Sequence, residues 1–184
     1  MSADTIDELP TTGTWAIDGS CSTVGFAAKH LLVATVRGRF DDVSGTVEVA
    51  DPIEASSIDV TIEAASISTG DAERDRRVRG RELLDVATYP QLRYTATGVH
   101  HRRGDSWTIP GELTIRDVTR AVELGVDYLG IITDAQGTEQ AAFSASTEID
   151  REAFGVTWNP ALEAGGVLVG RTVKVELEVR LVRV

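Results

Sequence analysis

The sequence has little of what exported or membrane-spanning proteins usually carry. Its only cysteine is Cys21, so no disulfide can form within the chain. No stretch approaches the uninterrupted apolar length of a membrane helix. The segment before Gly13 has neither the basic nor the apolar part of a secretory signal. We therefore expect a cytoplasmic protein with a disordered leader over residues 1–12 and a single domain over residues 13–184.

Basic residues are also scarce. Lysine and arginine number 18 against 29 aspartates and glutamates, which gives a formal net charge of -11. A chain this acidic is repelled by phosphate backbones, so nucleic acid is not expected as a partner. The same charge opposes docking on an anionic membrane face. Any contact with a membrane must then be apolar and local, without stable insertion.

The familiar catalytic and metal-binding motifs are missing. There is no G-x-S-x-G, no P-loop, no H-E-x-x-H and no C-x-x-C. His100 and His101 are adjacent, so on a strand they point to opposite faces and do not form a metal site. Cys21 has no neighbouring cation to activate its thiol, which favours an ordinary strand cysteine. We expect no metal and no cofactor.

What the sequence does have is apolar–polar alternation with a period of two. In residues 172–181 every second residue is apolar and the others are mostly charged, as in a strand with one buried and one wet face. Ile58, Val60 and Ile62 alternate with polar residues in the same way, and residues 122–128 do so more weakly. Residues 107–115 and 143–149, rich in threonine, isoleucine and aromatics, also indicate strands.

Short turns separate these strands, at residues 103–105, 116–117 and 134–137. Strands joined by short turns pair antiparallel, and six or more in one domain suggest a sandwich or a barrel. Aromatic residues make up only 5% of the chain, and ordinary core packing explains most of them. An eight-stranded barrel can be just filled by side chains, so composition does not decide whether the interior is hollow.

One segment, residues 70–84, departs from the alternation. It is dense in charge and contains no proline, and Glu73 and Asp75 each precede an arginine by four residues. Acid before base at this spacing predicts a helix over residues 70–84, packed through Leu83 and Leu84. Its charge run is either a solvated helix face or a structured ion pair at the mouth of a cavity.

At this point the chain resembles the YceI-like family of bacterial proteins, from about Gly13 to the C-terminus. Each matching piece is short, but their common order across nearly the whole chain is specific. The pieces are Trp15–Asp18, Val24–Phe26, Lys29–His30, Val36–Phe40, Gly45, Ala65–Gly70, Arg74–Asp75, Leu83–Val86, Tyr89–Pro90, Gly111–Ile115, Val118–Thr119, Ile149–Val156 and Trp158.

The resemblance implies a mainly β protein: a lipocalin-like antiparallel β-barrel of about eight strands with one capping α-helix. It also implies an elongated apolar interior that holds a polyisoprenoid or an isoprenoid quinone. Family members are often dimeric, which makes a homodimer one of the states expected here. Polar groups near His30 and Tyr89 are expected to meet the ligand's headgroup, with Arg74 and Asp75 at the barrel mouth. The residues expected to contact the ligand are Phe26, His30, Phe40, Val60, Ile62, Leu84, Tyr89, Tyr94, Phe143, Phe154, Trp158, Val175 and Leu177.

The chain departs from the family pattern at Cys21, which stands where relatives commonly have a histidine, and at Arg77-Val78, where relatives commonly have His-Leu. Three interpretations of function stay open. The first, which we favour, is a lipid carrier that is not an enzyme. The second is an enzyme acting on an isoprenoid lipid, with His30 or Asp75 as general acid or base. The third is a filled barrel that serves as a stress or interaction module without a ligand.

Overall fold

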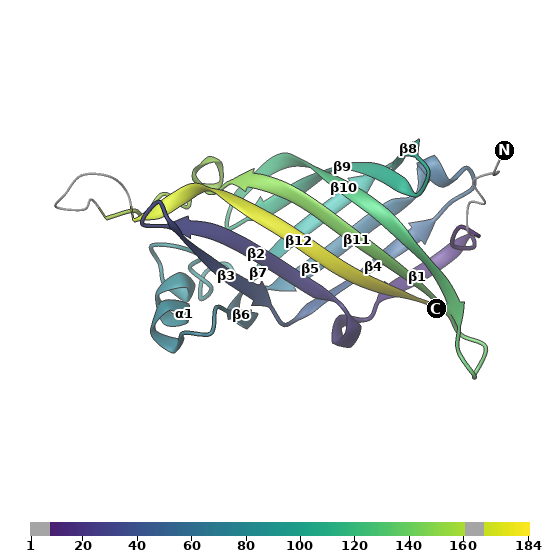
Figure 1. Cartoon of the computed structure of the whole chain (residues 1–184), viewed down its shortest axis with the longest axis horizontal. Coiled ribbons are helices and arrows are strands. Elements are labelled where there is room, and N and C mark those ends of the chain that lie inside the picture. The colour runs from purple at the N-terminus through teal and green to yellow at the C-terminus, as the bar shows by residue number, and fades with distance from the viewer. Residues whose placement is uncertain (1–7, 161–167) are drawn as a thin grey trace.

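The computed structural model describes residues 8–160 and 168–184, which form an elongated barrel (Figure 1). This part of the chain contains twelve strands and one α-helix, α1 (Ala72–Arg79). The strands are β1 (Gly13–Ile17), β2 (Thr23–His30), β3 (Ala34–Phe40), β4 (Val43–Val49), β5 (Ser57–Glu63), β6 (Ile67–Ser68), β7 (Gln91–Thr97), β8 (His100–Arg103), β9 (Ser106–Ile115), β10 (Val118–Thr133), β11 (Glu139–Asp150) and β12 (Val169–Arg183).

Eight of these strands close into an antiparallel barrel, in the order β1-β4-β5-β7-β9-β10-β11-β12 and back to β1. Closure comes from β1, which pairs with β4 on one edge and with the end of β12 on the other. After a 3₁₀ turn, β2 continues along β12, and it carries β3 and β6 on its outer edge. The expected barrel with one helix is confirmed.

The two ends of the barrel differ in what they carry (Figure 1). One end has α1, β6 and the turn between β2 and β3, and is called the helix end below. The other has β1 and the C-terminus, and is called the β1 end. None of the helices in residues 8–160 and 168–184 combines the length and the apolar character that crossing a bilayer would take.

Alternation in the sequence becomes an inside and an outside in the structure. Val175, Leu177 and Val179 of β12 face the interior, as do Ile58 and Val60 of β5. The predicted turns at residues 103–105, 116–117 and 134–137 join β8 to β9, β9 to β10 and β10 to β11. The period of two therefore identified the buried face of these strands correctly.

The helix prediction was wrong at both ends, since α1 covers residues 72–79 rather than 70–84. Asp71 caps its start, because the Asp71 carboxylate accepts a hydrogen bond from the backbone N–H of Arg74 at 2.9 Å. Gly80 ends it, and its N–H donates to the carbonyl of Arg77. Leu83 and Leu84 still pack against the core, but from the loop that follows the helix.

Two further expectations need correction. Cys21 is exposed on the 3₁₀ turn between β1 and β2, not on a strand. Residues 8–12, expected within a disordered leader, contact the barrel. The Tyr128 hydroxyl donates to the carbonyl of Glu8 at 2.6 Å, and the Trp15 indole N–H donates to the carbonyl of Thr11 at 2.9 Å. Pro10, between these two anchors, is buried.

A buried arginine ties the chain together at the helix end. The guanidinium of Arg151 donates to the carbonyls of Val156, Trp158, Val169 and Gly170 at distances of 2.8–3.1 Å. Burial lowers the pKa of Arg151, but a guanidinium stays charged, and four carbonyl dipoles stabilise that charge. This contact holds the segment after β11 against the start of β12.

Replacing this arginine tests how much the contact stabilises the fold. Because an ammonium group has no planar fork to reach four carbonyls, Arg151→Lys should lower the free energy of unfolding by about 2–4 kcal/mol. The matched control is Arg171→Lys, at an exposed arginine paired with Asp150, which should lower it by less than about 1 kcal/mol. Urea denaturation measures both, and equal midpoints would contradict the role given to Arg151.

Candidate binding cavity

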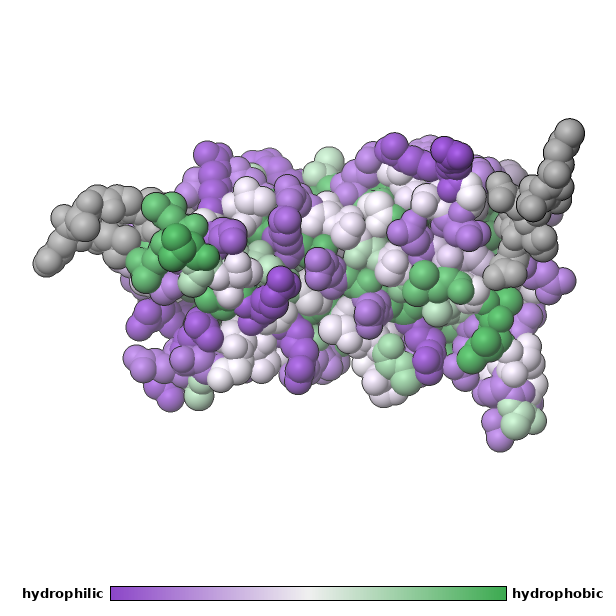
Figure 2. Space-filling view, in the orientation of Figure 1, coloured by the Kyte–Doolittle hydropathy of each residue, from purple (hydrophilic) through white to green (hydrophobic). Residues whose placement is uncertain are grey.

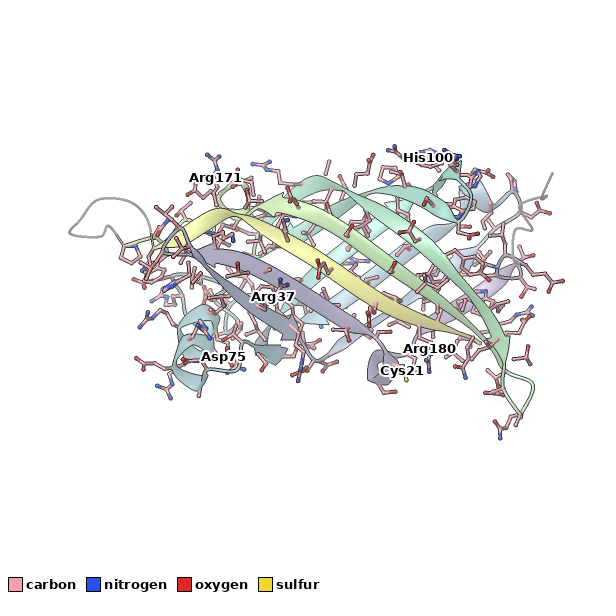
Figure 3. All side chains as sticks on the ribbon, viewed as in Figure 1. Cys21, Arg37, Asp75, His100, Arg171 and Arg180 are labelled. Atoms are coloured by element: carbon pink, nitrogen blue, oxygen red, sulfur yellow. The ribbon has the colours of Figure 1, made fainter. Side chains whose placement is uncertain are left out.

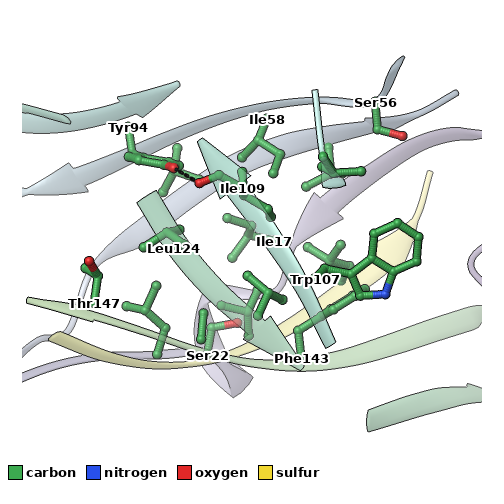
Figure 4. Close-up of a pocket in the computed structure, with 18 of the residues that line it drawn as sticks. Ile17, Ser22, Ser56, Ile58, Tyr94, Trp107, Ile109, Leu124, Phe143 and Thr147 are labelled. Atoms are coloured by element: carbon green, nitrogen blue, oxygen red, sulfur yellow. Dashed lines mark hydrogen bonds between the residues drawn. The ribbon is translucent and has the colours of Figure 1, made fainter. Parts of the chain in front are cut away.

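The barrel encloses a cavity, and Figure 4 shows part of its wall. The lining extends from Leu9 and Pro10, which precede β1, to Ile149 near the end of β11. The space open to the centre of a water-sized sphere is about 220 Å³. In this measure a single water needs ~10–15 Å³, so the space is equivalent to roughly fifteen to twenty waters. Side chains therefore do not fill the interior.

Every strand of the closed barrel contributes to the wall of the cavity. One example from each is Ile17 of β1, Val47 of β4, Val60 of β5, Tyr94 of β7, Ile109 of β9, Leu124 of β10, Phe143 of β11 and Leu177 of β12. Most lining residues are aliphatic, because inward positions alternate with polar outward positions along each strand. The lining residues that carry a polar side-chain atom are Ser22, Ser56, Tyr94, Trp107, Tyr128 and Thr147.

Most of these polar atoms are already bonded to the protein. The Tyr94 hydroxyl contacts the carbonyls of Ile109 and Val122 at 3.0 and 3.1 Å, and burial raises the pKa of Tyr94 far above its usual value. The Ser56 and Ser22 hydroxyl oxygens accept hydrogen bonds from backbone N–H groups. These groups hold strands and loops together and are not free to orient a ligand.

Two polar groups differ from the rest. Within the part of the chain that the structure describes, the Thr147 hydroxyl and the Trp107 indole N–H make no hydrogen bond. They lie on opposite sides of the pocket in Figure 4. A polar group in an apolar surrounding is unfavourable unless it meets a partner. Thr147 and Trp107 are therefore the places where the wall can meet a ligand oxygen or a water.

Toward the helix end, aromatic and aliphatic side chains of the described residues pack against one another. The rings of Phe26 and Phe40 lie 5.7 Å apart, and Phe40, Leu84 and Phe154 belong to one packed cluster. At the β1 end, by contrast, Leu9 and Pro10 lie against the cavity and cover part of it. The lining of the cavity thus includes Leu9 and Pro10 near the β1 end, but not the aromatic rings of Phe26, Phe40 and Phe154.

The structure divides the predicted contact residues into two groups. Those that line the cavity are Val60, Ile62, Tyr94, Phe143, Val175 and Leu177. Those that lie nearer the helix end, outside the lining, are Phe26, His30, Phe40, Leu84, Tyr89, Phe154 and Trp158. In the second group, Tyr89 and Trp158 each face an arginine, Arg116 at 5.6 Å and Arg77 at 5.8 Å.

Sequence reasoning missed several lining residues. Ile17 and Ile109 occupy inward positions of strands, so a stricter use of the alternation would have found them. Trp107 belongs to the same inward row as Ile109. Leu9 and Pro10 precede the first strand, and no local pattern indicates that they reach the interior.

Arg74 and Asp75 were expected at the mouth of a cavity, but neither lines it. Asp75 is buried and accepts hydrogen bonds from the N–H and hydroxyl of Thr69 at 2.9 and 2.6 Å. The guanidinium of Arg74 donates to the same hydroxyl at 2.8 Å. The pair fastens α1 to the residue that follows β6 at the helix end of the barrel, where Figure 3 labels Asp75.

The histidines and the cysteine do not come together. Among residues 8–160 and 168–184, no three His, Cys, Asp or Glu side chains lie close enough to hold a metal ion. His100 and His101 are exposed on β8, where the His101 ring lies 4.7 Å from the Trp107 ring. The carboxylates, histidines and thiol of the described chain all lie outside the cavity lining.

Comparison with known proteins gives one consistent result. The family model described as YceI-like domain matches residues 15–181. Protein YceI of Salmonella newport is 35% identical over 142 residues, covering 76% of this chain and 73% of that protein. Two solved structures share the fold. BcnA of Burkholderia cenocepacia has a TM-score of 0.75 and 22% identity, and the match covers 89% of this chain and 98% of that chain. A polyisoprenoid binding domain from Saccharophagus degradans has a TM-score of 0.70 and 17% identity, and the match covers 91% of this chain and 97% of that chain.

The contacts of Asp75 predict a measurable difference between two acids on the same helix. Asp75→Ala leaves the Thr69 N–H and hydroxyl without their acceptor in a buried site, so the free energy of unfolding should fall by about 2–4 kcal/mol. Glu73→Ala removes an exposed carboxylate 3.9 Å from Arg77 and should lower it by less than about 1 kcal/mol. Chemical denaturation of both variants provides the comparison. Wild-type stability in Asp75→Ala would show that the charge run is only a solvated face.

Proposed function

The chain belongs to the YceI-like domain family, and from that premise we propose that it binds and carries an isoprenoid lipid, either a polyisoprenoid or an isoprenoid quinone, inside the barrel. The observation that carries the proposal is the unfilled cavity with an almost entirely apolar wall. Such a wall has nothing to offer a charged or sugar-like ligand, and it matches a long branched hydrocarbon.

The size of the hydrophobic effect agrees with this function. Each buried methylene contributes roughly 0.8 kcal/mol, so a five-carbon isoprene unit contributes about 3–4 kcal/mol at most. Two or three buried units contribute about 6–12 kcal/mol, which offsets an association cost of ~4 kcal/mol, and about four units reach the net ~8 kcal/mol of micromolar affinity. Preference for chain length then depends on where the cavity stops.

A structural neighbour supports the same ligand class. The Saccharophagus degradans protein with the same fold is described as a polyisoprenoid binding domain. We carry that ligand class to this chain because the inward stripes of β5 and β12 form the cavity wall. A cytoplasmic location and a homodimer stay predictions of the sequence.

The two other interpretations receive less support. An enzyme needs a general acid or base near the reacting atoms, but His30 and Asp75 lie outside the cavity lining. The described lining residues include no carboxylate, histidine or thiol in their place. A ligand-free module would be expected to fill its interior, as protein cores normally do, and the unfilled space argues against it.

Filling the cavity should remove the ligand without unfolding the barrel. Ala145 lines the cavity on β11, so Ala145→Phe adds an apolar ring where a lipid would lie. The matched control, Ser146→Phe, adds the same ring to the exposed face of the same strand. Native mass spectrometry of proteins purified from bacterial cells should show a bound lipid on the wild type and the control, and little or none on Ala145→Phe. Wild-type protein without bound lipid, or full lipid retention in Ala145→Phe, would overturn the proposal.

Thr147 tests whether the ligand carries an oxygen within the barrel. Thr147→Val keeps the shape of the side chain and removes the hydroxyl. If a quinone carbonyl meets this hydroxyl, the variant should bind a prenyl quinone about three- to tenfold more weakly, which corresponds to ~1 kcal/mol. It should bind squalene, a hydrocarbon, as well as the wild type does. Thr46→Val, at an exposed position of β4, is the control, and unchanged quinone binding would exclude this contact.

A further inference from the structure

The turn between β2 and β3 exposes three consecutive large apolar residues. Leu31, Leu32 and Val33 have 44%, 74% and 85% of their surface in water. Figure 2 shows an apolar patch at the helix end, where β2 turns into β3. Single exposed apolar residues are common, but a contiguous group at the tip of a hairpin is typical of a surface that contacts a membrane or another protein.

The backbone of this turn is unusual for its side chains. Leu31 and Leu32 have φ values of 52° and 65°, in the left-handed region that glycine and asparagine adopt far more easily. The turn is held there by hydrogen bonds from the N–H of Leu31 to the carbonyl of Leu168 and from the N–H of Val33 to the carbonyl of Leu31. Leucines kept in a strained, exposed turn indicate a function for their side chains.

The balance of charge at the same end of the molecule differs from that of the whole chain. Residues 29–42 and 71–82 contain eight of the 18 lysines and arginines and six of the 29 acidic residues. Of these acids Asp75 is buried, and Asp41, Asp42, Asp71, Glu73 and Glu82 are exposed. These two segments therefore carry a small net positive charge, although the whole chain has a net charge of -11.

A series of contacts links α1 to the apolar turn. The guanidinium of Arg77 lies over the Trp158 ring, and the Trp158 carbonyl is bonded to Arg151. Arg151 also binds the carbonyl of Val169, which pairs with His30 at the base of the turn. On the other side, α1 contacts β6, and β6 pairs with β3. Figure 3 labels Arg37 on β3 and Asp75 on α1 in the same half of the molecule.

We propose that the helix end docks on the surface of an anionic lipid bilayer. The side chains of Leu31, Leu32 and Val33 enter the boundary between headgroups and acyl chains, and the arginines of α1 lie over the negative headgroups. The rest of the barrel, which carries the chain's excess of acidic residues, is turned away from the surface, so the charge separation orients the barrel. A second copy of the chain is the poorer partner, since it would bring the exposed arginines of one α1 helix against those of the other. This proposal does not rest on the identity of the ligand in the cavity.

Vesicle binding tests the proposal with matched variants of the full chain. The wild type is mixed with vesicles of phosphatidylcholine alone or with 30% phosphatidylglycerol added, and the bound fraction is measured by sedimentation. We expect binding to the anionic vesicles that weakens with added salt. The triple variant Leu31→Ser, Leu32→Ser, Val33→Ser should bind at least tenfold more weakly. The control is Leu129→Ser, Ile132→Ser, which removes two apolar residues exposed by 62% and 61% elsewhere on the molecule and should stay within twofold of the wild type.

Charge is tested separately from the apolar turn. Arg76→Glu, Arg81→Glu reverses two exposed arginines at the helix end and should abolish the preference for anionic vesicles. Arg102→Glu, Arg103→Glu makes the same change on exposed β8 and should keep that preference. The proposal is overturned if the wild type does not bind anionic vesicles, or if the triple variant binds as the wild type does. It is also overturned if size-exclusion chromatography shows a wild-type dimer and a monomeric triple variant, because the turn would then join two copies.

Discussion

The rest of the structure depends on the hydrogen bonding of β1 to two different neighbours. This strand has five residues, yet it pairs with β4 along one edge and with the end of β12 along the other. Without it the sheet would have two open edges, and the apolar inward face would be in contact with water. Trp15, which is fully buried, anchors β1 from inside, and its indole N–H bonds the chain that precedes the strand. Closure is what makes an enclosed apolar space possible in so short a chain.

The two ends of the closed barrel differ in how their residues pack. At the helix end, aromatic rings and the contact of Arg151 with four carbonyls make a closely packed region in which charged groups are held in fixed positions. Toward the β1 end, aliphatic side chains of alternating strands leave the space that a lipid can occupy. Residues 8–12 lie across that end through Tyr128 and Trp15.

How far the sequence predicted this structure depends on the range of the forces involved. Alternation is local, and it identified β5, β10 and β12 together with their inward faces. The ends of α1 were missed because the capping by Asp71 and the stop at Gly80 were not weighed against the charge pattern. Only some of the residues expected to contact a ligand line the cavity, for a different reason. Tyr94 and Phe143 line it, whereas Phe40 and Phe154 pack in the core, and tertiary packing decides whether an inward ring borders a space or fills it. The contact of Pro10 with the barrel is tertiary, and no local pattern reports it.

The unfilled cavity has a mechanical consequence for the empty protein. Unfolding removes internal voids, so the unfolded chain and its water occupy less volume than the folded barrel with a space of about 220 Å³ inside it. Hydrostatic pressure favours the smaller total volume and therefore shifts the empty barrel toward the unfolded state. An apolar molecule in the cavity takes up that volume and opposes the shift. The protein with a ligand in its cavity therefore resists unfolding by pressure better than the empty protein, because the ligand fills the space that the side chains leave open.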